Sequence, residues 1–153
     1  MSMDQDPLMT IVIPAYNEAH RLPETLRRVI AFVEAASEPL NVLVVNNNSR
    51  DATGAIATEV AAGHPCLRVT EQPLQGKGAA VRKGIFEAEG RYVFICDADL
   101  AMPIEELPRF YPAQLGGEYD IAIGSREAPG ARRFNEPFYR HLMGRIFNLM
   151  VCV

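Results

Sequence analysis

Short apolar runs alternate along the chain with segments of helical spacing. The runs rich in β-branched residues are typical of strands and cover residues 8–14, 40–45, 66–71, 92–96 and 120–124. Apolar residues that recur every three or four positions predict helices at 18–37, 52–62, 79–88 and 103–115. Strands and helices that alternate in this way favour βαβ crossovers. We therefore expect an α/β fold with a mostly parallel sheet that helices cover on both faces.

Two carboxylates follow directly after the run at 92–96. Asp97 and Asp99 are separated only by Ala98, and because side chains alternate along an extended chain, both start from the same side. In an open α/β sheet, ligands bind at the carboxyl ends of the strands, and paired carboxylates there favour a hard divalent cation. Mg²⁺ or Mn²⁺ would complete its coordination with water and phosphate oxygens, which predicts a metal-bridged diphosphate. A turn that merely ends the strand accounts for the same two residues, since Asp is common in turns.

Other polar residues follow the predicted strands at the same edge of the sheet. Tyr16 and Glu18 follow the first strand, an all-Asn run at 46–48 follows the second, and Arg126 follows the last. Lys77 opens the helix after the third strand, where backbone N–H groups and an ammonium suit an anion. One edge thus combines groups for a cation, a base and a phosphate, which predicts a site for a nucleoside diphosphate.

The composition is that of an ordinary folded domain. With 153 residues, 48% of them hydrophobic and 22% charged, we expect residues 1–153 to form a single domain. The net charge of -4 argues against nucleic acid as a partner, because binding to a phosphate backbone needs a clustered positive field. The cysteines show no C-x-x-C spacing and support neither a disulfide framework nor a zinc site. We expect a cytoplasmic protein, since no signal peptide begins the chain and no apolar run is long enough to span a bilayer.

Ordered motifs carry a resemblance to the family 2 glycosyltransferases of GT-A fold. The motifs are Ile11-Val-Ile-Pro-Ala-Tyr-Asn-Glu18, Val45-Asn-Asn-Asn-Ser-Arg-Asp51, Gly76-Lys-Gly-Ala-Ala-Val-Arg82, Asp97-Ala-Asp-Leu100 and Ile123-Gly-Ser-Arg126. Within this family the chain resembles the polyprenyl-phosphate sugar synthases of the dolichyl-phosphate glucosyl and mannosyl type. The resemblance implies a Rossmann-like three-layer α/β/α fold and a nucleotide-sugar donor, UDP-glucose or GDP-mannose. It also implies a polyprenyl-phosphate or saccharide acceptor.

The resemblance further implies which residues contact the donor. These are Pro14, Ala15, Tyr16, Glu18, Asn47, Lys77, Asp97, Ala98 and Arg126. In this scheme Asn47 would meet the edge of the base, while Lys77 or Arg126 would stabilise charge on the phosphates. Asp99, with help from Asp97, would hold Mg²⁺ or Mn²⁺. The reaction expected is an inverting transfer of a hexose, with the metal neutralising the departing nucleoside diphosphate.

The chain departs from the family pattern in two loops and in length. The family usually carries an Asp where Asn46 and Asn47 stand, so the base preference stays open between uracil and guanine. The mannose-synthase branch carries a metal-binding Gln where Ala101 stands. Family members also continue beyond the part that matches this chain, where their acceptor-side motif lies. We therefore expect residues 1–153 to lack the acceptor-side part, and we assign no catalytic base.

A basic segment near the end of the chain has two interpretations. Residues 126–145 hold five Arg against two Glu, interleaved with aromatic residues. The segment could hold a lipid phosphate, which would associate the protein peripherally with the inner face of a membrane. Alternatively, it is a core helix separated from its partners, in which case a homodimer would cover its apolar side.

Two other classes of function compete with a transferase. The chain could bind a nucleotide sugar without turning it over. It could also be a phosphatase in which Asp97 is the covalent nucleophile and Asp99 the acid. Such phosphatases usually place the motif after the first strand and carry Thr or Val where Ala101 stands, which disfavours this class. Kinase-like and dinucleotide-binding glycine motifs are absent from the sequence.

Overall fold

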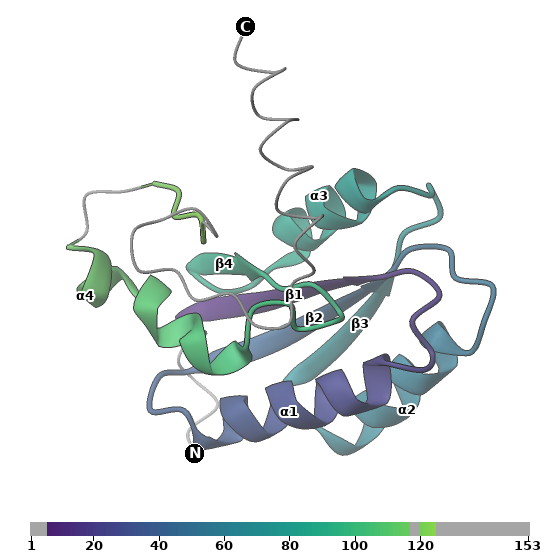
Figure 1. Ribbon diagram of the computed structural model, residues 1–153, viewed down its shortest axis with the longest axis horizontal. Helices are drawn as coiled ribbons and strands as arrows, with labels where there is room; N and C mark the ends of the chain where they lie inside the picture. The colour runs from purple at the N-terminus through teal and green to yellow at the C-terminus, as the bar shows by residue number, and fades with distance from the viewer. Residues whose placement is uncertain (1–5, 117–119, 125–153) are drawn as a thin grey trace, which may run out of the picture. The chain divides into compact units, whose positions relative to one another are not determined.

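A computed structural model describes residues 6–116 and 120–124 of the chain (Figure 1). The chain divides into two compact units, Met1–Gln114 and Leu115–Val153. The sheet, the helices that cover it and the pocket described below belong to the first unit.

The first unit is built on a parallel sheet. Its strands are β1 (Met9–Ala15), β2 (Leu40–Asn46), β3 (Leu67–Glu71) and β4 (Tyr92–Ile95). They lie in the order β3-β2-β1-β4, and every neighbouring pair is parallel. β1 lies inside the sheet and is buried along almost its whole length, as its run of β-branched residues predicts. The first four of the five predicted strands, and the parallel arrangement, are therefore confirmed.

Helices cover both faces of this sheet. α1 (Leu22–Ala35) and α2 (Thr53–Gly63) lie on one face and α3 (Lys77–Glu87) lies on the other (Figure 1). Right-handed crossovers explain this division. The chain moves in one direction across the sheet from β1 to β3, which puts α1 and α2 on one face, and then moves back past β1 to β4, which puts α3 on the other. The three-layer prediction is confirmed.

The core is unequal on the two faces. Alternate residues of β1, such as Ile11 and Ile13, join a large cluster with α1 and α2, whereas Val12 faces α3. α3 lies close to the sheet because it presents small residues. A Cβ atom added to Gly84 would stand only 2.2 Å from Cγ1 of Val12.

Two predicted elements differ in the structure. The single helix expected at 103–115 is a 3₁₀ helix, η1 (Ile104–Phe110), followed by a short α4 (Pro112–Leu115). Pro108 inside η1 and Pro112 after it have no backbone N–H to donate, so one continuous α-helix cannot form.

The last predicted strand is also wrong, because residues 120–124 have no regular secondary structure. So short a run is stable as a strand only when it pairs with a neighbour, and the sheet of the described residues has four strands. Among the described helices, none has the length and apolar character needed to cross a membrane.

Candidate functional site

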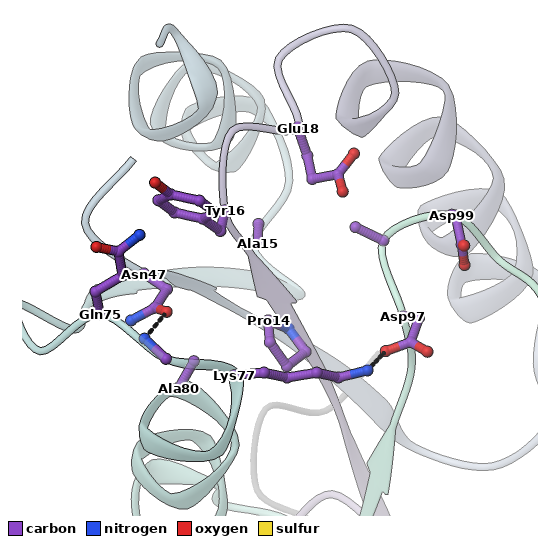
Figure 2. Close-up of a pocket in the computed structure, with 12 residues that line it drawn as sticks. Pro14, Ala15, Tyr16, Glu18, Asn47, Gln75, Lys77, Ala80, Asp97 and Asp99 are labelled. Atoms are coloured by element: carbon purple, nitrogen blue, oxygen red, sulfur yellow. Dashed lines mark hydrogen bonds and ion pairs between the residues drawn. The ribbon is translucent and has the colours of Figure 1, made fainter. Parts of the chain in front are cut away.

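A pocket of about 420 Å³ opens at the carboxyl edge of the sheet, a volume typical of small-molecule sites. The pocket lies at the end of β1, between its neighbours β2 and β4. This is the topological switch point of the sheet, because the chain leaves β1 towards β2 and later returns to the other side of β1 as β4. The pocket is lined by Pro14, Ala15, Tyr16, Glu18, Asn47, Gln75, Gly76, Lys77, Ala80, Asp97, Ala98 and Asp99. The loops after β1, β2 and β4 thus meet the start of α3 in one place (Figure 2).

The structure brings together the residues that the sequence singles out for this site. The predicted donor and metal residues all line the pocket except Arg126, which lies outside the described residues. Gln75, Gly76 and Ala80 line it as well but were not predicted as site residues. Gly76 and Ala80 belong to the motif Gly76–Arg82, and Gln75 directly precedes it. The motif at the start of this helix was therefore the signal that could have predicted all three as site residues.

The carboxylates after β4 project from a tightly fixed turn. Ala98 is buried between the exposed Asp97 and Asp99, as the alternation of side chains predicts. The buried Thr25 hydroxyl of α1 donates to the Ala98 carbonyl oxygen at 2.6 Å. Asp99 Oδ1 accepts from the Ala101 N–H at 2.9 Å. The segment is therefore both a turn and a wall of the pocket, and its binding of a metal stays a prediction.

Lys77 reaches across the pocket to this turn. Its Nζ lies 2.6 Å from Oδ1 of Asp97 (Figure 2). Gly76 makes this possible because its φ of +142° is a backbone conformation that residues with a Cβ rarely adopt, and α3 begins at the next residue. A cation therefore already lies against one of the two carboxylates.

The donor atoms of the pocket fit a divalent cation that is shared with a substrate. No group of three or more His, Cys, Asp or Glu suited to a metal occurs in residues 6–116 and 120–124. Asp97 and Asp99 supply only carboxylate oxygens, so phosphate and water would complete an octahedral shell. Burial, reinforced by the charges of Asp97 and Asp99, raises the pKa of the Cys96 thiol to about 11. The thiol is thus protonated at neutral pH, and Cys96 does not line the pocket.

Hydrogen bonds join the loop after β1 to the start of α2. The Glu18 N–H donates to Oγ1 of Thr53 at 2.8 Å, and the Ala19 N–H donates to Oδ2 of Asp51 at 3.1 Å. The Thr53 hydroxyl in turn donates to Oδ1 of Asp51. This hydroxyl holds the pKa of the Asp51 carboxyl below its ordinary value. The network fixes the backbone from which Glu18 enters the pocket.

The two asparagines that stand where the family usually has Asp both use their amide N–H groups. The buried Asn46 donates from Nδ2 to both carboxylate oxygens of Glu71, at 3.0 and 2.8 Å. Asn47, which is 3% exposed, donates from Nδ2 to the Leu74 carbonyl oxygen at 2.7 Å. Asp at either place would set a carboxylate against another acceptor. The surroundings of these two residues therefore favour amides over carboxylates.

The pocket has two chemically different ends. Figure 2 shows Tyr16 and Gln75 at one end, with Asp97 and Asp99 at the other. The first end offers an aromatic ring that is 39% exposed and an amide, which suit a planar base. The second end offers an ammonium and two carboxylates, which suit a metal-bound diphosphate.

Solved structures of the same fold include glycosyltransferases. A mannosyltransferase from Pyrobaculum calidifontis, in a structure with GDP-Man and Mn²⁺, is 28% identical to this chain. The similarity covers 72% of this chain and 32% of that one, with a TM-score of 0.58. The parallel sheet with a pocket at its switch point thus has the GT-A fold of glycosyltransferases.

Sequence comparison narrows this class to a family. Residues 10–150 match the family model of Glycosyl transferase family 2, and the chain belongs to this family. A dolichyl-phosphate beta-glucosyltransferase from Trichomonas vaginalis is 33% identical, covering 94% of this chain and 46% of the relative. A dolichol-phosphate mannosyltransferase from Pyrococcus furiosus is 35% identical, covering 90% and 38%. The resemblance predicted from the motifs is confirmed, and the chain spans less than half the length of these curated relatives.

Proposed function

We propose that this chain is the donor-binding part of a glycosyltransferase that moves a hexose from a nucleotide sugar to a polyprenyl phosphate. The observation that carries the proposal is the pocket itself, in which Lys77 pairs with Asp97 near Asp99 at one end and the Tyr16 ring lies at the other. The names of the two relatives, both transferases that act on dolichyl phosphate, support the acceptor class. The single family match over residues 10–150 supports one nucleotide-sugar-binding domain.

The proposed donor, UDP-glucose or GDP-mannose, lies with its base near Tyr16 and its diphosphate near the start of α3. Lys77 offers an ammonium there, beside the carboxylates of Asp97 and Asp99. Pro14, Ala15 and Ala98 supply the apolar wall between the two ends. The contribution of Arg126 to the phosphates stays a prediction from the sequence.

Mg²⁺ or Mn²⁺ would be held by Asp99 with help from Asp97. When bound, the metal supplies positive charge that neutralises the leaving diphosphate. With the metal bound, Asp97 would no longer pair with Lys77, and the ammonium would be free to contact a phosphate oxygen of the donor. The fixed turn around Ala98 keeps both carboxylates in place and lowers the reorganisation that the reaction needs.

The chemical step is a single displacement at the anomeric carbon. An oxygen of the polyprenyl phosphate forms the new bond, the bond from that carbon to the diphosphate breaks, and the configuration inverts. A phosphate acceptor is already ionised and needs less help from a general base than a sugar hydroxyl does. A lipid acceptor also implies work at a membrane surface, while peripheral association and a homodimer stay predictions.

A transfer assay tests this function. The chain is incubated with Mn²⁺, a polyprenyl phosphate in detergent micelles, and radiolabelled UDP-glucose or GDP-mannose. We expect label in the lipid fraction from one of the two donors, and none after a chelator is added. Donor binding without transfer would contradict transfer by this chain alone and favour the non-catalytic alternative. Release of phosphate from a simple monoester that is lost in Asp97→Asn would favour the phosphatase.

A further inference from the structure

Both the oxygen and the nitrogen of the Asn47 amide bond to one short segment of the chain. Its Oδ1 accepts from the Gly76 N–H at 2.8 Å, and its Nδ2 donates to the Leu74 carbonyl oxygen at 2.7 Å (Figure 2 shows the first bond). We propose that Asn47 is a positioning residue. It holds the 74–76 turn, and through it Lys77, in place for a diphosphate, and it does not read the base. This inference rests on the proposed function, because it names the role of one residue in the same site.

The position of the 74–76 turn determines where α3 begins. Gly76 precedes Lys77, the first residue of the helix, and the Gly76 carbonyl oxygen accepts the helical bond from the Ala80 N–H at 3.1 Å. Asn47 is itself anchored, since its backbone N–H donates to the Ala15 carbonyl oxygen at 2.8 Å. Asn47 therefore ties the ends of β1 and β2 to the start of α3. A shift of the turn would move the base of the Lys77 side chain with it.

The bonds of Asn47 require an amide. An Asp would keep an acceptor for the Gly76 N–H, but its second oxygen would face the carbonyl oxygens of Leu74 and Gln72, which lie 2.7 and 3.4 Å from Nδ2. Two acceptors that face one another repel and leave both unsatisfied. The Asn side chain is also 3% exposed, so a charge placed there would lose most of its hydration.

Other groups at this end of the pocket are better placed to contact a base. Gln75 lines the pocket with an exposed side chain, and Figure 2 shows it at the same end of the pocket as Tyr16. Neither end of the Gln75 amide takes part in a side-chain hydrogen bond within the described ranges, 6–116 and 120–124. An amide that both donates and accepts can contact uracil or guanine.

Two isosteric variants separate positioning from base reading. Asn47→Asp replaces the Nδ2 donor by an oxygen, and Asn48→Asp adds the same charge at the adjacent, exposed residue, which does not line the pocket. Binding of pyrophosphate, UDP and GDP is measured by calorimetry with Mn²⁺ present. For Asn47→Asp we expect all three affinities to fall by a similar factor, about tenfold, with the ratio of UDP to GDP unchanged. For Asn48→Asp we expect changes of less than about threefold.

A loss confined to the nucleotides, with a changed UDP to GDP ratio and unchanged pyrophosphate binding, would overturn the inference. Hydrogen exchange at the Gly76 amide, measured by NMR without ligand, tests the same role independently. We expect faster exchange in Asn47→Ala, which removes the acceptor of this N–H, than in the wild type and in Asn48→Asp, and equal rates would also overturn the inference. If the wild type binds neither pyrophosphate nor nucleotide, the proposed function fails. Faster exchange at Gly76 would then still support the hold of Asn47 on the turn.

Discussion

The ammonium of Lys77 lies 2.6 Å from a carboxylate oxygen of Asp97, and this ion pair joins the first residue of α3 to the turn after β4. The two side chains are 67% and 50% exposed, so water screens the pair and it contributes little to stability. Each partner also faces the pocket. The ion pair can therefore open, with Lys77 binding a phosphate and Asp97 binding a metal.

Removal of the ammonium should separate metal binding from diphosphate binding. In Lys77→Met we expect Mn²⁺ alone to bind a few-fold more tightly, because Asp97 is no longer paired, and a nucleoside diphosphate to bind about tenfold more weakly. Calorimetric titrations with Mn²⁺, and with nucleotide at saturating Mn²⁺, measure the two effects. Lys83→Met removes the same charge from α3 at a residue paired with Glu87 outside the pocket, and it should change neither. Equal weakening of both ligands in Lys77→Met would contradict the exchange of partners.

Asn46 should be intolerant of Asp because of Glu71. In the wild type, Asn46 donates to both carboxylate oxygens of Glu71. Asn46→Asp places a buried carboxylate against these two oxygens, and we expect the free energy of unfolding at pH 7 to fall by about 1–3 kcal/mol. Adding Glu71→Gln should recover most of the loss, since a Gln amide can donate to Asp. Urea unfolding of the two single variants and the double variant measures the coupling. Strictly additive effects would show that the two side chains do not interact.

An added methyl group should destabilise the protein at Gly84 of α3 but not at Gly78 of the same helix. A Cβ at Gly84 would stand 2.2 Å from Cγ1 of Val12, whereas a Cβ at Gly78 has no neighbour within 4 Å. We expect Gly84→Ala to lower the free energy of unfolding by about 1–3 kcal/mol through overpacking. Gly78→Ala should be neutral or raise it by up to about 1 kcal/mol, because alanine favours the helix. Thermal unfolding of both variants checks this, and equal stability would mean that α3 does not lie against β1 as described.

The fold followed from the sequence because its signals are local. The apolar runs that form β1 and β2 have the length and β-branched content of buried parallel strands, and each ends at a polar loop. The run that forms β4 predicts a buried strand too, but β4 lies at an edge of the described sheet and buries only Phe94. Parallel strands place their carboxyl ends at one edge, so residues as far apart as Tyr16 and Asp99 were predicted to lie together, and they line one pocket.

The bonds made by Asn46 and Asn47 had no local signal. Their partners Glu71 and Gly76 lie 25 and 29 residues further along the chain, and only the packing of β3 and α3 brings them near. Sequence reasoning therefore placed Asn47 at the pocket but could not see that its amide was already occupied. The helix predicted at 103–115 is a different case, because Pro108 is part of the sequence and its missing N–H prevents the regular helix that the apolar spacing predicts.

The Asp51 network should make stability depend on acid pH. The Thr53 hydroxyl lowers the pKa of the Asp51 carboxyl in the folded protein, so the ionised form contributes stability above the unfolded pKa of roughly 3.9. This contribution falls as the pH drops through the lower, folded pKa. In Asp51→Asn an N–H₂ group would face the Ala19 N–H, and the variant should be less stable than the wild type near neutral pH. Urea unfolding as a function of pH should show this difference shrink below about pH 4, and a difference independent of pH would contradict the role of the charge.

Calorimetric titration with UDP and GDP, with and without Mn²⁺, tests the central claim that this pocket binds a nucleoside diphosphate through a metal. Asp99→Asn is the test variant, because it removes the charge but keeps an oxygen to accept from the Ala101 N–H. Glu59→Gln, an exposed carboxylate of α2 outside the pocket, is the control. We expect Mn²⁺ to strengthen the binding of one nucleotide to the wild type and to the control, and Asp99→Asn to lose about tenfold or more, roughly 1.4 kcal/mol. Binding that is absent from the wild type, or equally strong without Mn²⁺ and in Asp99→Asn, would contradict the claim.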